Sequence, residues 1–184
     1  MLNKKILDQL LIETDHHLIK KTDLVLIGGT ALVLKYLSPR ATIDVDTYTK
    51  VTKELAAAWK KAEIKVGVQV PLSKATISEG PYQMEDRFTA YKDLSLKHLN
   101  ILVPDPADII LMKISRLFGK DRDDIAYLIK HSKIPQKVLL KRFTEEMGHI
   151  TGDRKTLNSQ YLLAIEDNYG KGVADKHQIV LKKK

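Results

Sequence analysis

A short apolar run that ends in two glycines constrains the fold of this chain more than any other feature. Residues 23–27 read Asp-Leu-Val-Leu-Ile, and Gly28, Gly29 and Thr30 follow. A run of this length bounded by glycines is typical of a buried strand that closes in a tight turn. Thr30 is suited to cap a helix over residues 31–36, which Pro39 would stop. The pattern therefore predicts a strand, a turn and a helix in succession.

The remaining periodicity predicts an α/β (α+β) fold with a helical second half. Helical patterns cover residues 3–20, 52–63, 105–118, 123–131, 135–147 and 157–169, and strand patterns cover residues 41–48, 65–70 and parts of 89–103. The helix at residue 105 has an acidic cap followed by proline, and Gly119 is expected to close it. We expect an α/β core over residues 1–103 and a helical segment over residues 104–184 packed on it.

Composition narrows the chemistry that the chain can perform. It contains no cysteine, which excludes a disulfide framework, a thiolate zinc site and a cysteine nucleophile. It has neither a signal-peptide stretch nor an apolar run of the ~20 residues that a membrane helix needs, so we expect a cytoplasmic protein without membrane contact. The net charge is +8, with most of the surplus in residues 131–184. Such a surplus suits a nucleic acid, but it is also common on solvated helices.

Two carboxylates follow the glycine turn at a spacing that suits a metal ion. Asp44 and Asp46 stand two apart in the predicted strand 41–48, and residues i and i+2 of a strand project from the same face. Paired carboxylates repel unless they are solvated or share a cation such as Mg²⁺. Glycines in a turn let the backbone approach a ligand, and N–H groups at a helix start attract anions. Together, a phosphate-binding turn and a metal-binding acid pair are the features that phosphoryl or nucleotidyl transfer requires. Taken alone, the glycines also fit a structural turn, and the acids also fit a solvated strand.

These residues resemble a known signature. Gly28-Gly29-Thr30 followed by Arg40-Ala41-Thr42-Ile43-Asp44-Val45-Asp46 resembles that of the nucleotidyltransferase superfamily, a glycine-rich turn before an apolar-Asp-x-Asp strand. Residues 104–114 resemble the family's helix with an embedded lysine, here Lys113, and residues 120–125 resemble its basic-Asp-x-x-Asp-apolar motif, which includes Asp121. The resemblance covers about residues 23–131. It is closest to a minimal prokaryotic branch with lincosamide-type antibiotic nucleotidyltransferases and toxins of abortive-infection toxin–antitoxin systems.

The resemblance implies a nucleotidyltransferase-like mixed sheet flanked by helices, with a helical C-terminal segment. It implies that the nucleotide phosphates are bound by Gly28, Gly29, Thr30, Arg40 and Lys113. It also implies a catalytic set, which consists of Asp44, Asp46, Lys113 and Asp121.

The metal would be Mg²⁺, held by Asp44, Asp46 and a third carboxylate that active relatives usually take from a later strand. The candidates are Glu79, Glu85, Asp86 and Asp93, and we favour Asp86. Independently of the resemblance, Lys113 lies among apolar residues, so its amine must either reach water or find an acid.

The expected function is Mg²⁺-dependent transfer of a nucleoside monophosphate from an NTP to a hydroxyl of an RNA, a protein or a small molecule. A toxin restrained by an antitoxin protein is one cellular role for that reaction. The alternative is a catalytically inactive module of the same fold that binds nucleotide, nucleic acid or a partner protein. For RNA we expect an exposed basic patch, formed by Lys137, Lys141, Arg142, Arg154 and Lys155.

Overall fold

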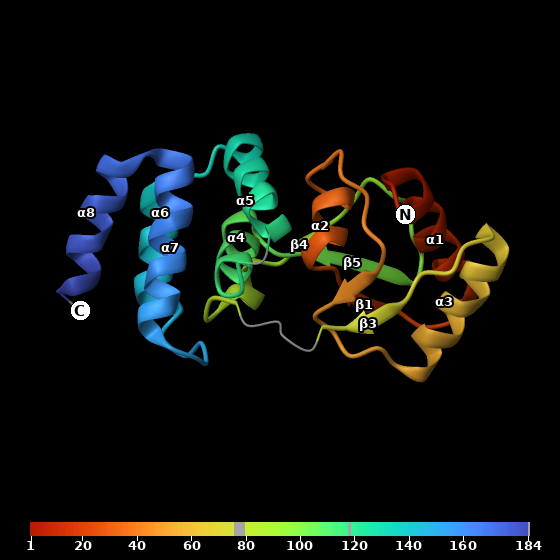
Figure 1. The fold of residues 1–184 in the computed structure, drawn as a ribbon. Helices are drawn as coiled ribbons and strands as arrows, with labels where there is room; N and C mark the ends of the chain where they lie inside the picture. The colour runs from red at the N-terminus through yellow and green to blue at the C-terminus, as the bar shows by residue number, and fades with distance from the viewer. Residues whose placement is uncertain (76–79, 118, 184) are drawn as a thin grey trace. The chain divides into compact units, whose positions relative to one another are not determined.

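The computed structural model describes residues 1–75, 80–117 and 119–183, and the chain divides into two compact units (Figure 1). The first unit comprises Met1–Ser78 and Arg87–Pro104, and the second comprises Glu79–Asp86 and Asp105–Lys184. The first mixes strands with helices, whereas the second is helical. The predicted α+β class is therefore confirmed.

The first unit contains both pieces of sheet. Its elements are α1 (Lys4–His17), β1 (Thr22–Val25), α2 (Gly28–Leu34), β2 (Val45–Thr47), α3 (Lys53–Val66), β3 (Leu72–Lys74), β4 (Thr89–Ala90) and β5 (Leu99–Val103). β5 pairs in parallel with β1 and antiparallel with β4, while β2 pairs in parallel with β3. An antiparallel bridge between Leu26 and Thr47 joins the chain after β1 to β2. This bridge brings the glycine turn next to the strand that carries Asp46.

Helix α1 holds the first unit together through its apolar face and its last turn. Leu7, Leu10 and Leu11 are fully buried, as the three-and-four spacing predicts, and the helix packs against α2, α3 and β5. At its end the Asp15 carboxylate accepts the backbone N–H groups of residues 97–99, at 3.0, 2.6 and 2.6 Å. Burial raises the pKa of Asp15, but these hydrogen bonds outweigh it and leave the pKa below its usual value.

The predicted strand over residues 65–70 is wrong. Helix α3 continues to Val66, and Gly67 ends it in a left-handed conformation with φ of +74°, which glycine adopts at little cost. Beyond it, Val70 is tied back to α3, because its N–H donates to Glu63 Oε1 (2.6 Å) and its carbonyl accepts Trp59 Nε1 (2.8 Å). The alternation of valines in this segment resembles a strand, but its hydrogen bonds go to helix side chains.

The second unit is built from helices. It contains most of the short 3₁₀ helix η1 (Met84–Arg87), followed by α4 (Pro106–Ile114), α5 (Gly119–Ser132), α6 (Gln136–Glu146), α7 (Arg154–Tyr169) and α8 (Lys171–Lys182). The predicted end of α4 is wrong, because the helix stops at Ile114 and Leu117 takes a left-handed φ of +39°. Gly119 consequently begins α5 rather than closing α4. Helix α8 was not predicted.

Aromatic rings and a buried histidine join the last three helices. The rings of Phe143 and Tyr161 stack with centroids 4.0 Å apart, and the Tyr161 ring stacks in turn on His177 of α8. The Tyr161 hydroxyl lies 3.0 Å from His177 Nδ1, and His177 Nε2 pairs with the Gln136 side chain. Burial lowers the pKa of His177. Of the helices that the structure describes, none is both long enough and apolar enough to cross a membrane.

Candidate nucleotide site

The glycine turn lies directly against the carboxylate of Asp46. Gly28 has a φ of +59°, a conformation that favours glycine. A Cβ on Gly28 would lie 3.3 Å from Asp46 Oδ2, and the neighbouring Ile27 N–H donates to the Asp46 carbonyl at 3.1 Å. The backbone of the turn and the acid are therefore held at close range, with no side chain between them at Gly28.

Threonines hold the other acid, Asp44, beside the same turn. The Thr42 hydroxyl donates to Asp44 Oδ1 at 3.2 Å, and Thr30 Oγ1 donates to the Asp44 carbonyl at 3.1 Å. The predicted cap role of Thr30 is wrong, because α2 begins at Gly28 with Ile27 in the cap position. The predicted strand 41–48 is also shorter than expected, since β2 begins at Val45. Asp44 thus lies just before the strand and is positioned by hydroxyl groups.

Gly29 and Arg40 complete the surroundings of the turn. A Cβ on Gly29 would lie 3.1 Å from Thr42 Oγ1 and 3.6 Å from Arg40 Nη2. The absence of a side chain at Gly29 thus admits the threonine that orients Asp44, and the guanidinium adds positive charge beside the turn. Six of the residues expected from the sequence lie together here, namely Gly28, Gly29, Thr30, Arg40, Asp44 and Asp46.

The donor set fits Mg²⁺ in part. Asp44 and Asp46 are half-buried carboxylates, and Mg²⁺ prefers such oxygen ligands. Among residues 1–75, 80–117 and 119–183, no group of three or more His, Cys, Asp or Glu side chains could hold a metal ion. Mg²⁺ commonly binds through one or two carboxylates and completes its shell with water and substrate phosphates. The pair therefore suits a cation that arrives with a nucleotide.

Lys113 is the centre of a buried charge network in the second unit. Its side chain is 3% exposed, and Nζ donates to Asp121 Oδ1 at 2.9 Å and to Asp124 Oδ2 at 2.7 Å. Arg116 Nε also donates to Asp121, at 3.1 Å. Burial raises the pKa of Asp121, but the hydrogen bonds and charges of Lys113 and Arg116 outweigh it and lower the pKa overall. Asp124 is the second acid of the basic-Asp-x-x-Asp-apolar motif over residues 120–125, but no role was predicted for it, although its spacing from Asp121 places both on one face of α5.

A family model described as "Nucleotidyltransferase of unknown function (DUF6036)" matches residues 5–168, which include the glycine turn, the acid pair and the Lys113 network. The chain belongs to this family. The predicted resemblance to nucleotidyltransferases is therefore confirmed, while α8 begins after the matched range. No curated protein and no solved structure matches the chain.

The third metal-binding carboxylate, for which Asp86 is favoured, stays a prediction for this member of the nucleotidyltransferase family. Asp86 and Glu85 are exposed on η1 in the second unit, and Asp93 is exposed in the first. Glu79 lies outside the described residues.

The prediction that Arg142 belongs to an exposed basic patch of the C-terminal helices is wrong. Arg142 Nη1 bonds to Asp105 at 2.6 Å and to Asp108 at 2.8 Å, so its charge is neutralised within the second unit. Arg154 donates to the Met147 carbonyl and lies over the Phe143 ring. The remaining members, Lys137, Lys141 and Lys155, are exposed.

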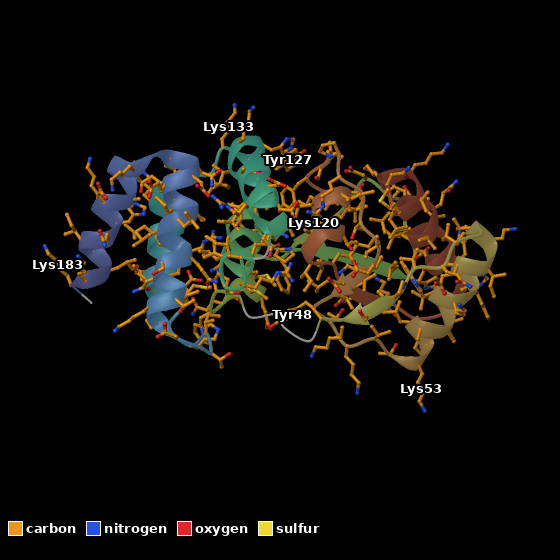
Figure 2. All side chains as sticks on the ribbon, in the orientation of Figure 1. Tyr48, Lys53, Lys120, Tyr127, Lys133 and Lys183 are labelled. Atoms are coloured by element: carbon orange, nitrogen blue, oxygen red, sulfur yellow. The ribbon has the colours of Figure 1, made fainter. Side chains whose placement is uncertain are left out.

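Exposed lysines lie on both units rather than gathering in the C-terminal helices alone. Figure 2 shows the side chains of Lys53 on α3 and of Lys133, directly after α5, pointing away from the ribbon.

Proposed function

We propose that the chain is a Mg²⁺-dependent nucleotidyltransferase that moves a nucleoside monophosphate from an NTP to a hydroxyl acceptor. The observation that carries the proposal is the placement of Asp44 and Asp46 against the glycine turn, with Asp46 Oδ2 3.3 Å from where a Gly28 Cβ would lie. Membership in a nucleotidyltransferase family supports the same chemistry.

The residues of the site have separate roles in this proposal. The bare backbone at Gly28 and Gly29 admits the phosphates, and the Arg40 guanidinium balances part of their charge. Asp44, oriented by Thr42, and Asp46 face the reacting group, where a carboxylate can accept the proton of the attacking hydroxyl. Mg²⁺, when bound with the nucleotide, neutralises phosphate charge.

The reaction exchanges one phosphorus–oxygen bond for another. The acceptor oxygen bonds to the α-phosphorus, the bond to the β-phosphate oxygen breaks, and pyrophosphate leaves. In the second unit, Asp121 and Asp124 orient the amine of Lys113, and the phosphate-binding role that the resemblance implies for Lys113 stays a prediction.

The second candidate function is a nucleotide-binding module without transfer. The observation that favours it is that the described residues contain no three-carboxylate metal group. Such a module keeps the turn and the acid pair as a binding site. The two candidates differ in whether pyrophosphate is released.

Calorimetry of Mg²⁺–NTP binding tests both candidates. We expect the double variant Asp44→Asn, Asp46→Asn to bind at least about tenfold more weakly, a loss of about 1.4 kcal/mol or more. Asp23→Asn is the matched control, because Asp23 is an exposed acid on β1 whose partner is Asn100. Equal affinities of wild type and the double variant would refute the site, and binding without pyrophosphate release from any NTP and acceptor pool would favour the module.

A further inference from the structure

The register of β2 and β3 places Ser73 beside Asp46. The two strands run in parallel, with Val45 opposite Leu72, Asp46 opposite Ser73 and Thr47 opposite Lys74. Backbone hydrogen bonds on either side of the central pair secure this register, from Val45 N–H to the Pro71 carbonyl at 2.9 Å and from Ala75 N–H to the Thr47 carbonyl at 3.0 Å. Neighbouring strands lie about 4.8 Å apart, so the Cβ atoms of Asp46 and Ser73 are close neighbours.

Burial shows which face of the strands carries this pair. Val45 and Thr47 are fully buried, whereas Asp46 is half-buried and Ser73 is exposed. Because side chains alternate between the two faces of a strand, Asp46 and Ser73 share the solvent-facing side. Asp46 is also the residue that contacts the glycine turn. Ser73 therefore stands at the edge of the candidate nucleotide site.

A residue at this position decides how many charges the site offers to a cation. An acid here would join Asp44 and Asp46 as a third carboxylate, whereas serine supplies one neutral hydroxyl oxygen. Affinity for a hard divalent cation rises with the number of charged ligands. With serine, the protein contributes two charged side chains, and the remaining ligands must be water or phosphate oxygens.

We propose that Ser73 occupies the third position of this site, so that the protein retains a divalent cation only together with nucleotide phosphates. The proposal rests on the proposed function for the identity of the ligand, and on the strand register for the position of Ser73. It makes Ser73 a residue that sets the affinity of the nucleotide-free site for a metal ion. Nucleotide-free protein would then hold the metal weakly.

Titration with Mn²⁺ alone, read by electron paramagnetic resonance, tests the position without any nucleotide. We expect Ser73→Asp to bind Mn²⁺ at least about tenfold more tightly than wild type, because it adds a charged ligand. Ser95→Asp adds the same charge at an exposed position outside the strands, and Ser73→Asn changes the residue without charge. Both controls should leave affinity unchanged, and adding Asp46→Asn to Ser73→Asp should abolish the gain.

A thiol offers a second readout that avoids crowding three acids. The chain has no cysteine, so Ser73→Cys introduces a sole thiol beside Asp46, and we expect it to bind Cd²⁺ more tightly than Ser95→Cys does. The proposal is overturned if neither Ser73 variant exceeds its Ser95 control, or if wild type binds Mn²⁺ as tightly as Ser73→Asp. If wild type fails to bind NTP while the Ser73 variants gain metal affinity, the proposed function fails and the geometry stands.

Discussion

Replacing Lys113 with methionine tests the charge network of the second unit. Methionine keeps the length and the helix propensity of the lysine stem, so the change removes little besides the ammonium group. Two charge-assisted hydrogen bonds, of 2.9 and 2.7 Å, disappear, and the side chains of Asp121 and Asp124 stay 6% and 3% exposed. Asp121 keeps its bonds to Arg116, and Asp124 loses its bond of 2.7 Å to Lys113.

The expected cost follows from the charge that the substitution leaves buried. Removing one partner of a buried ion pair destabilises a protein by about 3–5 kcal/mol, because the other charge loses its compensation. We expect a loss of that size for Lys113→Met. Adding Asp124→Asn removes the buried charge that has lost its bond to Lys113 and should restore about 1–2 kcal/mol.

Urea unfolding followed by far-UV circular dichroism measures this loss. Fluorescence of Trp59, the sole tryptophan of the chain, reports on the first unit in the same titration. A loss below about 1 kcal/mol would refute the reasoning, since that is the range of exposed pairs. An unchanged Mg²⁺–NTP affinity in the folded variant would contradict the phosphate-binding role that the resemblance implies for Lys113.

Two further predictions concern the turn and the last helix. Gly29→Ala should cost about 1–2 kcal/mol of stability through contact of its Cβ with Thr42 Oγ1, net of the better helix propensity of alanine, and adding Thr42→Ala should recover stability in thermal melts. If the double variant then binds NTP more weakly than Thr42→Ala alone, phosphate also needs the bare backbone at Gly29. Equal NTP affinities of these two proteins would restrict Gly29 to a packing role. Burial lowers the pKa of His177, so the unfolded chain binds the proton more readily and stability should fall as the pH drops below about 6.5, by up to about 1.4 kcal/mol per pH unit. His177→Gln should flatten that dependence in urea titrations at pH 7 and 5, and a parallel decline in both proteins would contradict the assignment.

Much of the site was predictable because its signals are local. The apolar run before Gly28 and the spacing of Asp44 and Asp46 each depend on a few neighbouring residues, and the structure confirms that the turn and the acids lie together. The apolar neighbours of Lys113 leave its amine two outcomes, to reach water or to find an acid. Its pairing with Asp121 confirms that reasoning.

Other features depended on contacts between distant segments. The valines before Val70 alternate as in a strand, but Glu63 and Trp59 bind the Val70 backbone and leave α3 to end at Gly67. Buried backbone groups take whichever partner the folded chain provides, and local alternation carries no information about that partner.

The position of Ser73 shows the same limit at the candidate site. Its side chain is unremarkable in the sequence, and a shift of one residue in the pairing of β3 would turn it to the opposite face. Only the long-range hydrogen bonds between β2 and β3 place it beside Asp46. Local patterns therefore determined which residues form the turn and the acid pair. Strand pairing decided that Ser73 is the side chain beside Asp46, because register is a property of two segments at once.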